Sequence, residues 1–183
     1  DDYLDTDLFL DHRDLRRTCA KASDGQRMLN LFSYTCSASV VAALAGATVT
    51  SVDLSATYLD WGRDNFEAND LDPAAHRFEQ GDVRRFLERH DQRYRCVLLA
   101  PPSYSRSKRM DGDLDLVRDH EDLITRCHGL LEEGGELYFS THARELEVAP
   151  VFLERFSGQE ITKVTTPRDF PRGPHRTWRF QRG

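Results

Sequence analysis

The chain has 183 residues, and its 25 Lys and Arg against 31 Asp and Glu give a formal charge of −6 with neutral histidines. With 39% apolar and 31% charged residues it is too apolar for a disordered protein, and no apolar run approaches the roughly 20 residues of a membrane span. Membrane-spanning, fibrous and disordered classes are therefore excluded, and the length predicts a single domain over residues 1–183. The acidic balance also argues against a nucleic-acid-binding protein, for which a basic domain is the usual expectation.

Short β-rich runs alternate with helical segments, which predicts an α/β fold with a doubly wound, mainly parallel sheet covered by helices on both faces. A first helix is expected at 14–22. Strands are expected at 27–31, 48–53, 76–80, 95–100, 136–140, 160–165 and 177–181, with helices between them at 37–45, 55–69, 82–90, 116–131 and 145–156. The last two strands are separated by a Pro-rich loop from Thr166 to Pro174 and by no helix, so they are expected to pair antiparallel.

The four cysteines, Cys19, Cys36, Cys96 and Cys127, have no CxxC spacing, and no secretory leader precedes them. We therefore expect reduced thiols in a cytoplasmic protein. The seven histidines supply no clustered ligand pattern, so the sequence predicts no metal site.

Ligands of an open α/β sheet bind at the carboxyl ends of its strands. The first strand is followed by NLFSYTCSAS, Asn30 to Ser39, a turn of small residues that enters a helix. The first amides of that helix could face a carboxylate or phosphate, or the segment could be an ordinary turn with Ser37 as the N-cap.

Acidic residues follow the second and third strands. Asp53 ends the second strand about twenty residues beyond the first turn, where a carboxylate can accept hydrogen bonds from a ribose diol. Gly81 and Asp82 follow the third strand, where a short polar side chain could meet the amine of adenine. Either aspartate could instead be a helix cap.

The fourth strand runs into the segment VLLAPPSYSRSKRM, Val97 to Met110. Pro101 and Pro102 fix φ near −65° and remove two amide donors, so they predict a stiff corner that can hold a planar base. Tyr104 could stack on that base, and Lys108 and Arg109 could meet phosphates. The alternative is a rigid loop with solvated cations.

The charge is unevenly distributed. Residues 163–183 carry six Lys or Arg and one acid, a net charge of +5, so the other 162 residues carry 19 − 30 = −11. We expect a basic cleft rim on an acidic body, with a solvated hairpin as the alternative.

Five motifs together resemble class I S-adenosylmethionine-dependent RNA methyltransferases, over nearly the whole chain. They are FLDHR at 9–13, NLFSYT at 30–35, VDLS at 52–55, PPSYSRSKRM at 101–110 and Asp169-Phe170. The nearest resemblance is to the C-terminal, guanine-N7 half of the bacterial large-subunit ribosomal RNA methyltransferase K/L family, with the 5-methylcytosine enzymes next. It implies a Rossmann-like fold, S-adenosylmethionine as cofactor, ribosomal RNA as partner, and a domain taken from a longer protein.

The resemblance also implies roles for individual residues. The cofactor would be held by Asp11, His12, Arg13, Phe32, Ser33, Tyr34, Thr35, Ser37, Asp53, Leu54, Gly81, Asp82 and Ala100. The proline corner and the distribution of cations, apart from the resemblance, predict that Pro101, Pro102 and Tyr104 position the base and that RNA is bound by Ser103, Lys108, Arg109, Arg168, Arg172 and Arg176. No general base is assigned, since His142 is expected to be a loop or substrate-contact residue.

Two residues depart from the family pattern. Cys36 stands where glycine is usual and is expected to crowd the methionine group, and Ala100 stands where Asp or Asn is usual. Alanine cannot accept a hydrogen bond from an amine. The segment that begins with Pro101 and Pro102, the PP loop (residues 101–110), holds no cysteine that could attack a pyrimidine. Guanine N7 needs no deprotonation, so it is the preferred acceptor. A degenerate, non-catalytic fold and a small-molecule methyltransferase stay open as alternatives.

Overall fold

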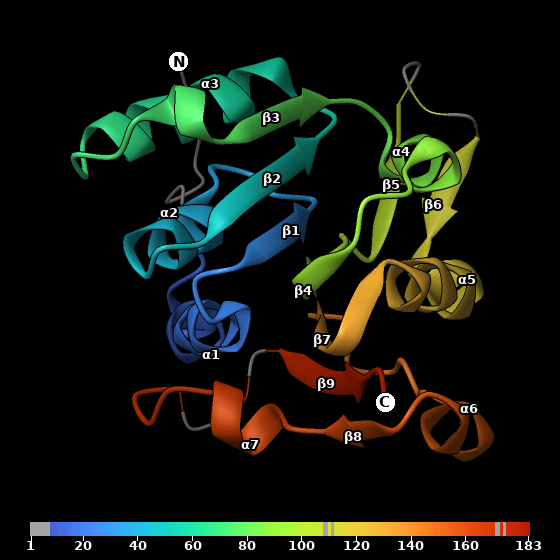
Figure 1. Cartoon of the computed structure of the whole chain (residues 1–183). Coiled ribbons are helices and arrows are strands. Elements are labelled where there is room, and N and C mark those ends of the chain that lie inside the picture. The colour runs from blue at the N-terminus through green and yellow to red at the C-terminus, as the bar shows by residue number, and fades with distance from the viewer. Residues whose placement is uncertain (1–7, 108–109, 111, 171–172, 174) are drawn as a thin grey trace.

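A seven-stranded sheet in the order β3-β2-β1-β4-β7-β9-β8 forms the centre of the molecule (Figure 1). The computed structural model describes residues 8–107, 110, 112–170, 173 and 175–183. The parallel strands are β1 (Arg27–Leu31), β2 (Thr48–Asp53), β3 (Arg77–Gln80), β4 (Tyr94–Leu99) and β7 (Leu131–Thr141). Strand β9 (Arg176–Gln181) lies antiparallel between β7 and β8 (Gly158–Glu160). The predicted parallel sheet with an antiparallel C-terminal pair is confirmed.

Helices cover both faces of this sheet (Figure 1). One face carries α1 (Arg13–Ser23), α2 (Ser37–Leu44) and α3 (Ala56–Glu67); the other carries α4 (Val83–Arg89), α5 (Leu116–Gly129) and α6 (Pro150–Arg155). Successive side chains of a strand point to opposite faces of the sheet, so Met28 packs in the core under α1, α2 and α3, and Leu29 packs in the core under α4, α5 and α6. Burial on both faces is clearest in β4, where Cys96 to Leu99 are all buried and apolar, whereas β2 buries the polar residues Thr50 and Ser51. In the described part of the chain, no helix is long and apolar enough to cross a membrane.

Short elements fill the connections. The 3-10 helices η1 (Leu10–His12) and η2 (Pro73–Ala75) precede α1 and β3. The segment after Pro101 and Pro102 forms a separate antiparallel pair, β5 (Tyr104–Arg106) and β6 (Asp113–Asp115), which sequence analysis did not predict. The Leu116 amide bonds the Ser103 carbonyl at 3.1 Å and so ties this pair to the start of α5.

The strand predicted at 160–165 is wrong. The strand occupies Gly158–Glu160, and the one-turn helix α7 (Thr162–Thr165) follows it. The Ile161 amide still pairs with the Thr177 carbonyl at 2.8 Å, but the Thr165 amide then bonds the Ile161 carbonyl at 3.2 Å. Hydrogen bonds from the turn thus override the strand preference of this β-branched segment.

The helix predicted at 145–156 is shorter than expected. It begins at Pro150, whose ring suits the first helical position and lacks the amide that a longer helix would need.

Candidate active site

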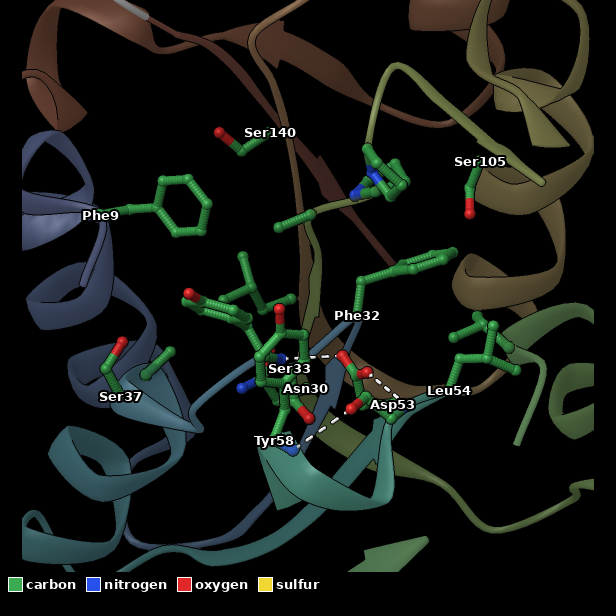
Figure 2. Close-up of a pocket in the computed structure, with 18 of the residues that line it drawn as sticks. Phe9, Asn30, Phe32, Ser33, Ser37, Asp53, Leu54, Tyr58, Ser105 and Ser140 are labelled. Carbon is green, nitrogen blue, oxygen red and sulfur yellow. Dashed lines mark hydrogen bonds between the residues drawn. The ribbon is translucent and has the colours of Figure 1, made fainter. Parts of the chain in front are cut away.

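A cavity of about 480 Å³ opens at the carboxyl ends of β1 to β4 (Figure 2). Its first set of lining residues comes from these strand ends and the turns after them: Asn30, Phe32, Ser33, Tyr34, Ser37, Asp53, Leu54, Gly81, Asp82, Ala100, Pro101 and Pro102. A second set comes from the N-terminal segment and the end of β7: Phe9, His12, Arg16, Ser140 and His142. Most of the predicted cofactor residues therefore meet in one cavity.

The turn after β1 is built from residues in left-handed conformations, without glycine. Phe32, Tyr34 and Cys36 have φ of 57°, 50° and 60°. The turn is held by hydrogen bonds from the Ser33 amide to the Val52 carbonyl (3.0 Å) and from the Tyr34 amide to the Asp53 carboxylate (2.9 Å). Cys36, not Ser37, is the N-cap of α2, and no side chain in the described part of the chain caps this helix. The alternative reading of Ser37 as a cap is wrong.

Cys36 does not crowd the cavity, contrary to the expectation from sequence. Its side chain is fully buried and packs against α3, where a Cβ added to Gly62 would lie 2.5 Å from the Cys36 sulfur. Burial raises the pKa of the Cys36 thiol to about 11. The residue is therefore a neutral packing group behind the turn.

Asp53 ends β2 and faces the cavity. Its carboxylate accepts hydrogen bonds from the amides of Tyr34 and Ser55, both at 2.9 Å (Figure 2). Burial raises the pKa of Asp53 even though these bonds oppose the shift. Ser55 is the N-cap of α3, accepting from the Tyr58 amide, so Asp53 is not that cap. A carboxylate has about four acceptor positions, which leaves capacity for a vicinal diol.

Asp82 serves as a helix cap and also lines the cavity. Its carboxylate accepts from the Arg84 amide at 2.9 Å and pairs with the Arg84 guanidinium at 3.3 Å. Leu54 and Val83 line the cavity beside it. Apolar walls next to a carboxylate suit a flat base with an exocyclic amine.

Six of the lining residues, named the acceptor wall because sequence analysis predicts the substrate base at Pro101 and Pro102, are Phe32, Ala100, Pro101, Pro102, Ser105 and Met110. Figure 2 shows the Phe32 ring and Ser105 on one side, away from Phe9 and Ser37. Pro101 is buried and Pro102 exposed. Tyr104 is 57% exposed, and neither it nor Ser103 lines the cavity. The acceptor wall thus offers apolar surface and one hydroxyl, with no ionisable side chain among these residues.

A buried carboxylate joins the N-terminal segment to β7 and β9. The Asp11 side chain accepts from His142 Nε2 and His175 Nδ1, both at 3.0 Å. The His12 ring stacks on His142 at 5.3 Å, and its Nε2 lies 3.2 Å from the Ser140 hydroxyl. Burial alone would raise the pKa of Asp11, but the two histidine hydrogen bonds and nearby positive charge hold it well below its usual range. The network fixes His12 and His142 as cavity walls, with Asp11 behind them.

The same cluster has the composition of a metal site. Asp11, His12 and His175 each offer a ligand atom, and these atoms lie within 4.8 Å of one another. The sequence had predicted no such grouping, because Asp11 and His175 are 164 residues apart and are joined only by the fold.

Other predicted residues lie outside the cavity lining. Arg13 pairs with Asp169 on the surface at 2.5 Å, and Thr35 is buried, with its carbonyl accepting from Asn65 at 2.9 Å. Arg176 forms ion pairs with Glu160 at 3.0 Å and with Glu147 at 3.1 Å, so its positive charge is neutralised by two carboxylates of the same domain. Arg168 is exposed, and Lys108, Arg109 and Arg172 lie outside the described residues. The structure does not assemble the expected basic rim from the residues it describes.

Sequence reasoning missed Phe9, Arg16 and Ser140 as lining residues. The available signal for Arg16 was its place on the apolar face of α1, between Leu15 and Cys19, where a charge has no structural reason to be. Phe9 begins the FLDHR motif, which was a signal for this segment, whereas Ser140 carried none.

The model of the family described as S-adenosylmethionine-dependent methyltransferase matches residues 2–168. Curated relatives named ribosomal RNA large subunit methyltransferase K/L include one from Legionella pneumophila (strain Corby), 48% identical over 93% of this chain. Another, from Allochromatium vinosum, is 46% identical over 99% of it. The chain spans 24% and 25% of the length of these two relatives.

Solved structures agree with this match. SMU.776 complexed with SAH has a TM-score of 0.78 and 29% identity, over 99% of this chain and 52% of that one. A methyltransferase from Agrobacterium tumefaciens (TM-score 0.75, 21% identity, 97% of this chain and 64% of that one) shares the fold. S-adenosylmethionine also suits the cavity, because Asp53 can accept from its ribose diol and the apolar wall at Leu54 and Val83 can hold its adenine. The chain belongs to the S-adenosylmethionine-dependent methyltransferase family.

Proposed function

We propose that this domain methylates a base of large-subunit ribosomal RNA and that the acceptor atom is guanine N7. The names of the relatives support the RNA substrate, and the acceptor wall supports the atom. When bound, S-adenosylmethionine supplies a methyl group on a positively charged sulfur.

The residues of this chain hold the two reactants in line. Asp53 orients the ribose, and Asp82 with Leu54 and Val83 receives the adenine. Pro101 and Pro102 form a corner with fixed φ, against which a substrate base can lie. Phe32 and Met110 add apolar surface to the lining of the same cavity, which favours the exclusion of water from it. Positioning of this kind can supply much of the barrier reduction for a reaction that needs no proton transfer.

The chemistry of the acceptor wall carries the choice of atom. An exocyclic amine is best oriented by a side-chain acceptor before the two prolines, and Ala100 has none. Methylation at C5 of a pyrimidine needs a thiolate, whereas all four cysteines are buried and none lines the cavity. Guanine N7 has an in-plane lone pair and requires neither group.

The test compares ribosomal RNA nucleosides from cells that lack the gene with those from cells complemented by the wild-type gene or by Asp53→Asn. Mass spectrometry should find one 7-methylguanosine restored by the wild-type gene and reduced in the variant. Restoration of an N2-methylguanosine or a 5-methylcytosine instead would refute the acceptor atom. An unchanged set of ribosomal nucleosides would refute the RNA substrate.

The second arm addresses the alternatives. Turnover of RNA should fall steeply between low and moderate salt, because RNA affinity depends on phosphate contacts. Turnover that is independent of salt would favour a small substrate. Activity that appears only after Ala100→Asp would favour a degenerate domain.

A further inference from the structure

Arg16 is a buried cation that lines the cavity. Arg16 is 8% exposed, and one nitrogen of its guanidinium group donates a hydrogen bond to the Phe9 carbonyl at 2.7 Å. The neighbouring arginines of α1 have acidic partners: Arg13 pairs with Asp169 and Arg17 with Asp14. Among the residues that the structure describes, none forms an ion pair with Arg16. Lys21, the other cation of this helix, is exposed to solvent, so Arg16 is the one buried cation of α1.

A buried charge without a counterion is costly, and such groups are normally paired. Burial lowers the pKa of Arg16, and the negative charge of Asp11 opposes the shift. An arginine stays protonated in spite of this. A guanidinium has five N–H donors, and one hydrogen bond to Phe9 leaves most of them available to an anion in the cavity.

The position of Arg16 in the cavity indicates which part of the cofactor it would contact. Helix α1 packs beside α2, whose first residues Ser37 and Ala38 also line the cavity. Asp53 and Asp82 lie at the ends of β2 and β3, farther along the sheet. Figure 2 shows Ser37 and Phe9 on the side away from Leu54. Arg16 would therefore be the cavity cation available to the amino-acid tail of a nucleoside held at Asp53.

We propose that Arg16 binds the carboxylate of the methionine moiety of S-adenosylmethionine. The planar guanidinium matches a carboxylate with two parallel hydrogen bonds, and the Phe9 carbonyl fixes its orientation. Arg16 is a cofactor-binding residue in this assignment, and the surface pair of Arg13 and Asp169 only anchors the start of α1.

Calorimetric titration of the whole chain with two ligands tests the assignment. One is S-adenosylhomocysteine, and the other is its decarboxylated analogue, which keeps the adenosine, sulfur and ammonium. Arg16→Met should weaken S-adenosylhomocysteine binding about 30-fold, the equivalent of one charge-assisted interaction of about 2 kcal/mol. The same variant should change the affinity for the decarboxylated analogue by less than about threefold. An equal loss for both ligands would overturn the proposal.

The matched control is Arg17→Gln, on the exposed side of the same turn, which should bind both ligands as the wild type does. The ligand-free unfolding temperature separates a structural role from a binding role. Arg16→Met should unfold no earlier than the wild type, since it removes an unpaired buried charge. Should the variant unfold early, Arg16→Gln decides the question, because its amide can still donate to the Phe9 carbonyl but carries no charge: loss of preference for the carboxylate ligand supports the proposal, and an unchanged preference contradicts it.

Discussion

Acidification should destabilise this fold through His12. The ring is largely enclosed by the rings of His142 and His175, with centroids at 5.3 Å and 4.6 Å. Burial and the proximity of His175 lower the pKa of His12 from 6.5 to about 3, although the Asp11 carboxylate opposes the shift. The folded protein therefore keeps His12 neutral at a pH where the unfolded chain binds a proton there.

The size of the effect follows from proton linkage. Between pH 7 and pH 5 an unfolded histidine with a pKa near 6.5 becomes almost fully protonated, while a folded one with a pKa near 3 does not. Stability is lost as the pH falls, because the unfolded state binds more protons. For one group, the linkage integral over this range is about 2 kcal/mol of unfolding free energy.

Urea unfolding at pH 7, 6 and 5 measures this quantity in the wild type and in His12→Gln. Glutamine is neutral at every pH and can still hydrogen-bond to Ser140. The wild type should lose about 2 kcal/mol more than the variant over the range, and Arg17→Gln should behave as the wild type does. Parallel curves for the wild type and His12→Gln would show that His12 does not titrate as its surroundings imply. Asp11, His142, His175 and Arg16 also face this ring, and they are unchanged in the comparison.

Three further outcomes are expected. Asp53→Asn should weaken S-adenosylhomocysteine binding by about tenfold or more in calorimetry, because an amide offers one acceptor oxygen to a diol that the carboxylate meets with two. Gly62→Ala should lower the unfolding free energy by about 1–3 kcal/mol, because the added Cβ would lie 2.5 Å from the Cys36 sulfur. The double variant with Cys36→Gly should recover most of this loss, and no recovery would contradict the packing of Cys36 against Gly62. The Cys36 thiol, with a pKa of about 11, should resist alkylation by iodoacetamide at pH 8 in the folded protein, and mass mapping that finds it modified before unfolding would refute its burial.

The strand pattern and the order of strand-end residues were predictable from the sequence. Strands β1 and β2 begin and end where predicted, since short segments with β-branched or apolar residues lie between turn residues there. Asp53 and Asp82 followed from the rule that parallel strands present their carboxyl ends at one edge. Local pattern and fold agree at these positions, so the prediction needed no knowledge of packing.

Long-range contacts account for what was missed. Asp11 and His175 are in contact only because β9 inserts beside β7, and no local sequence pattern predicts that contact. Arg176 is predicted to bind RNA, but in the structure Glu147 and Glu160 neutralise it. The side chain of Cys36 turns toward α3 because its backbone is left-handed, a conformation that residue type alone does not predict for cysteine.

The turn after β1 has a consequence for variation at this site. Each non-glycine residue with positive φ costs on the order of 1 kcal/mol, and Phe32, Tyr34 and Cys36 all have positive φ. Glycine at any of them would relax the backbone and at the same time remove a ring or a sulfur that packs nearby. A glycine variant at any one of the three positions would therefore exchange backbone strain for lost packing, and its net effect on the free energy of unfolding measures which of the two contributions is larger at that position.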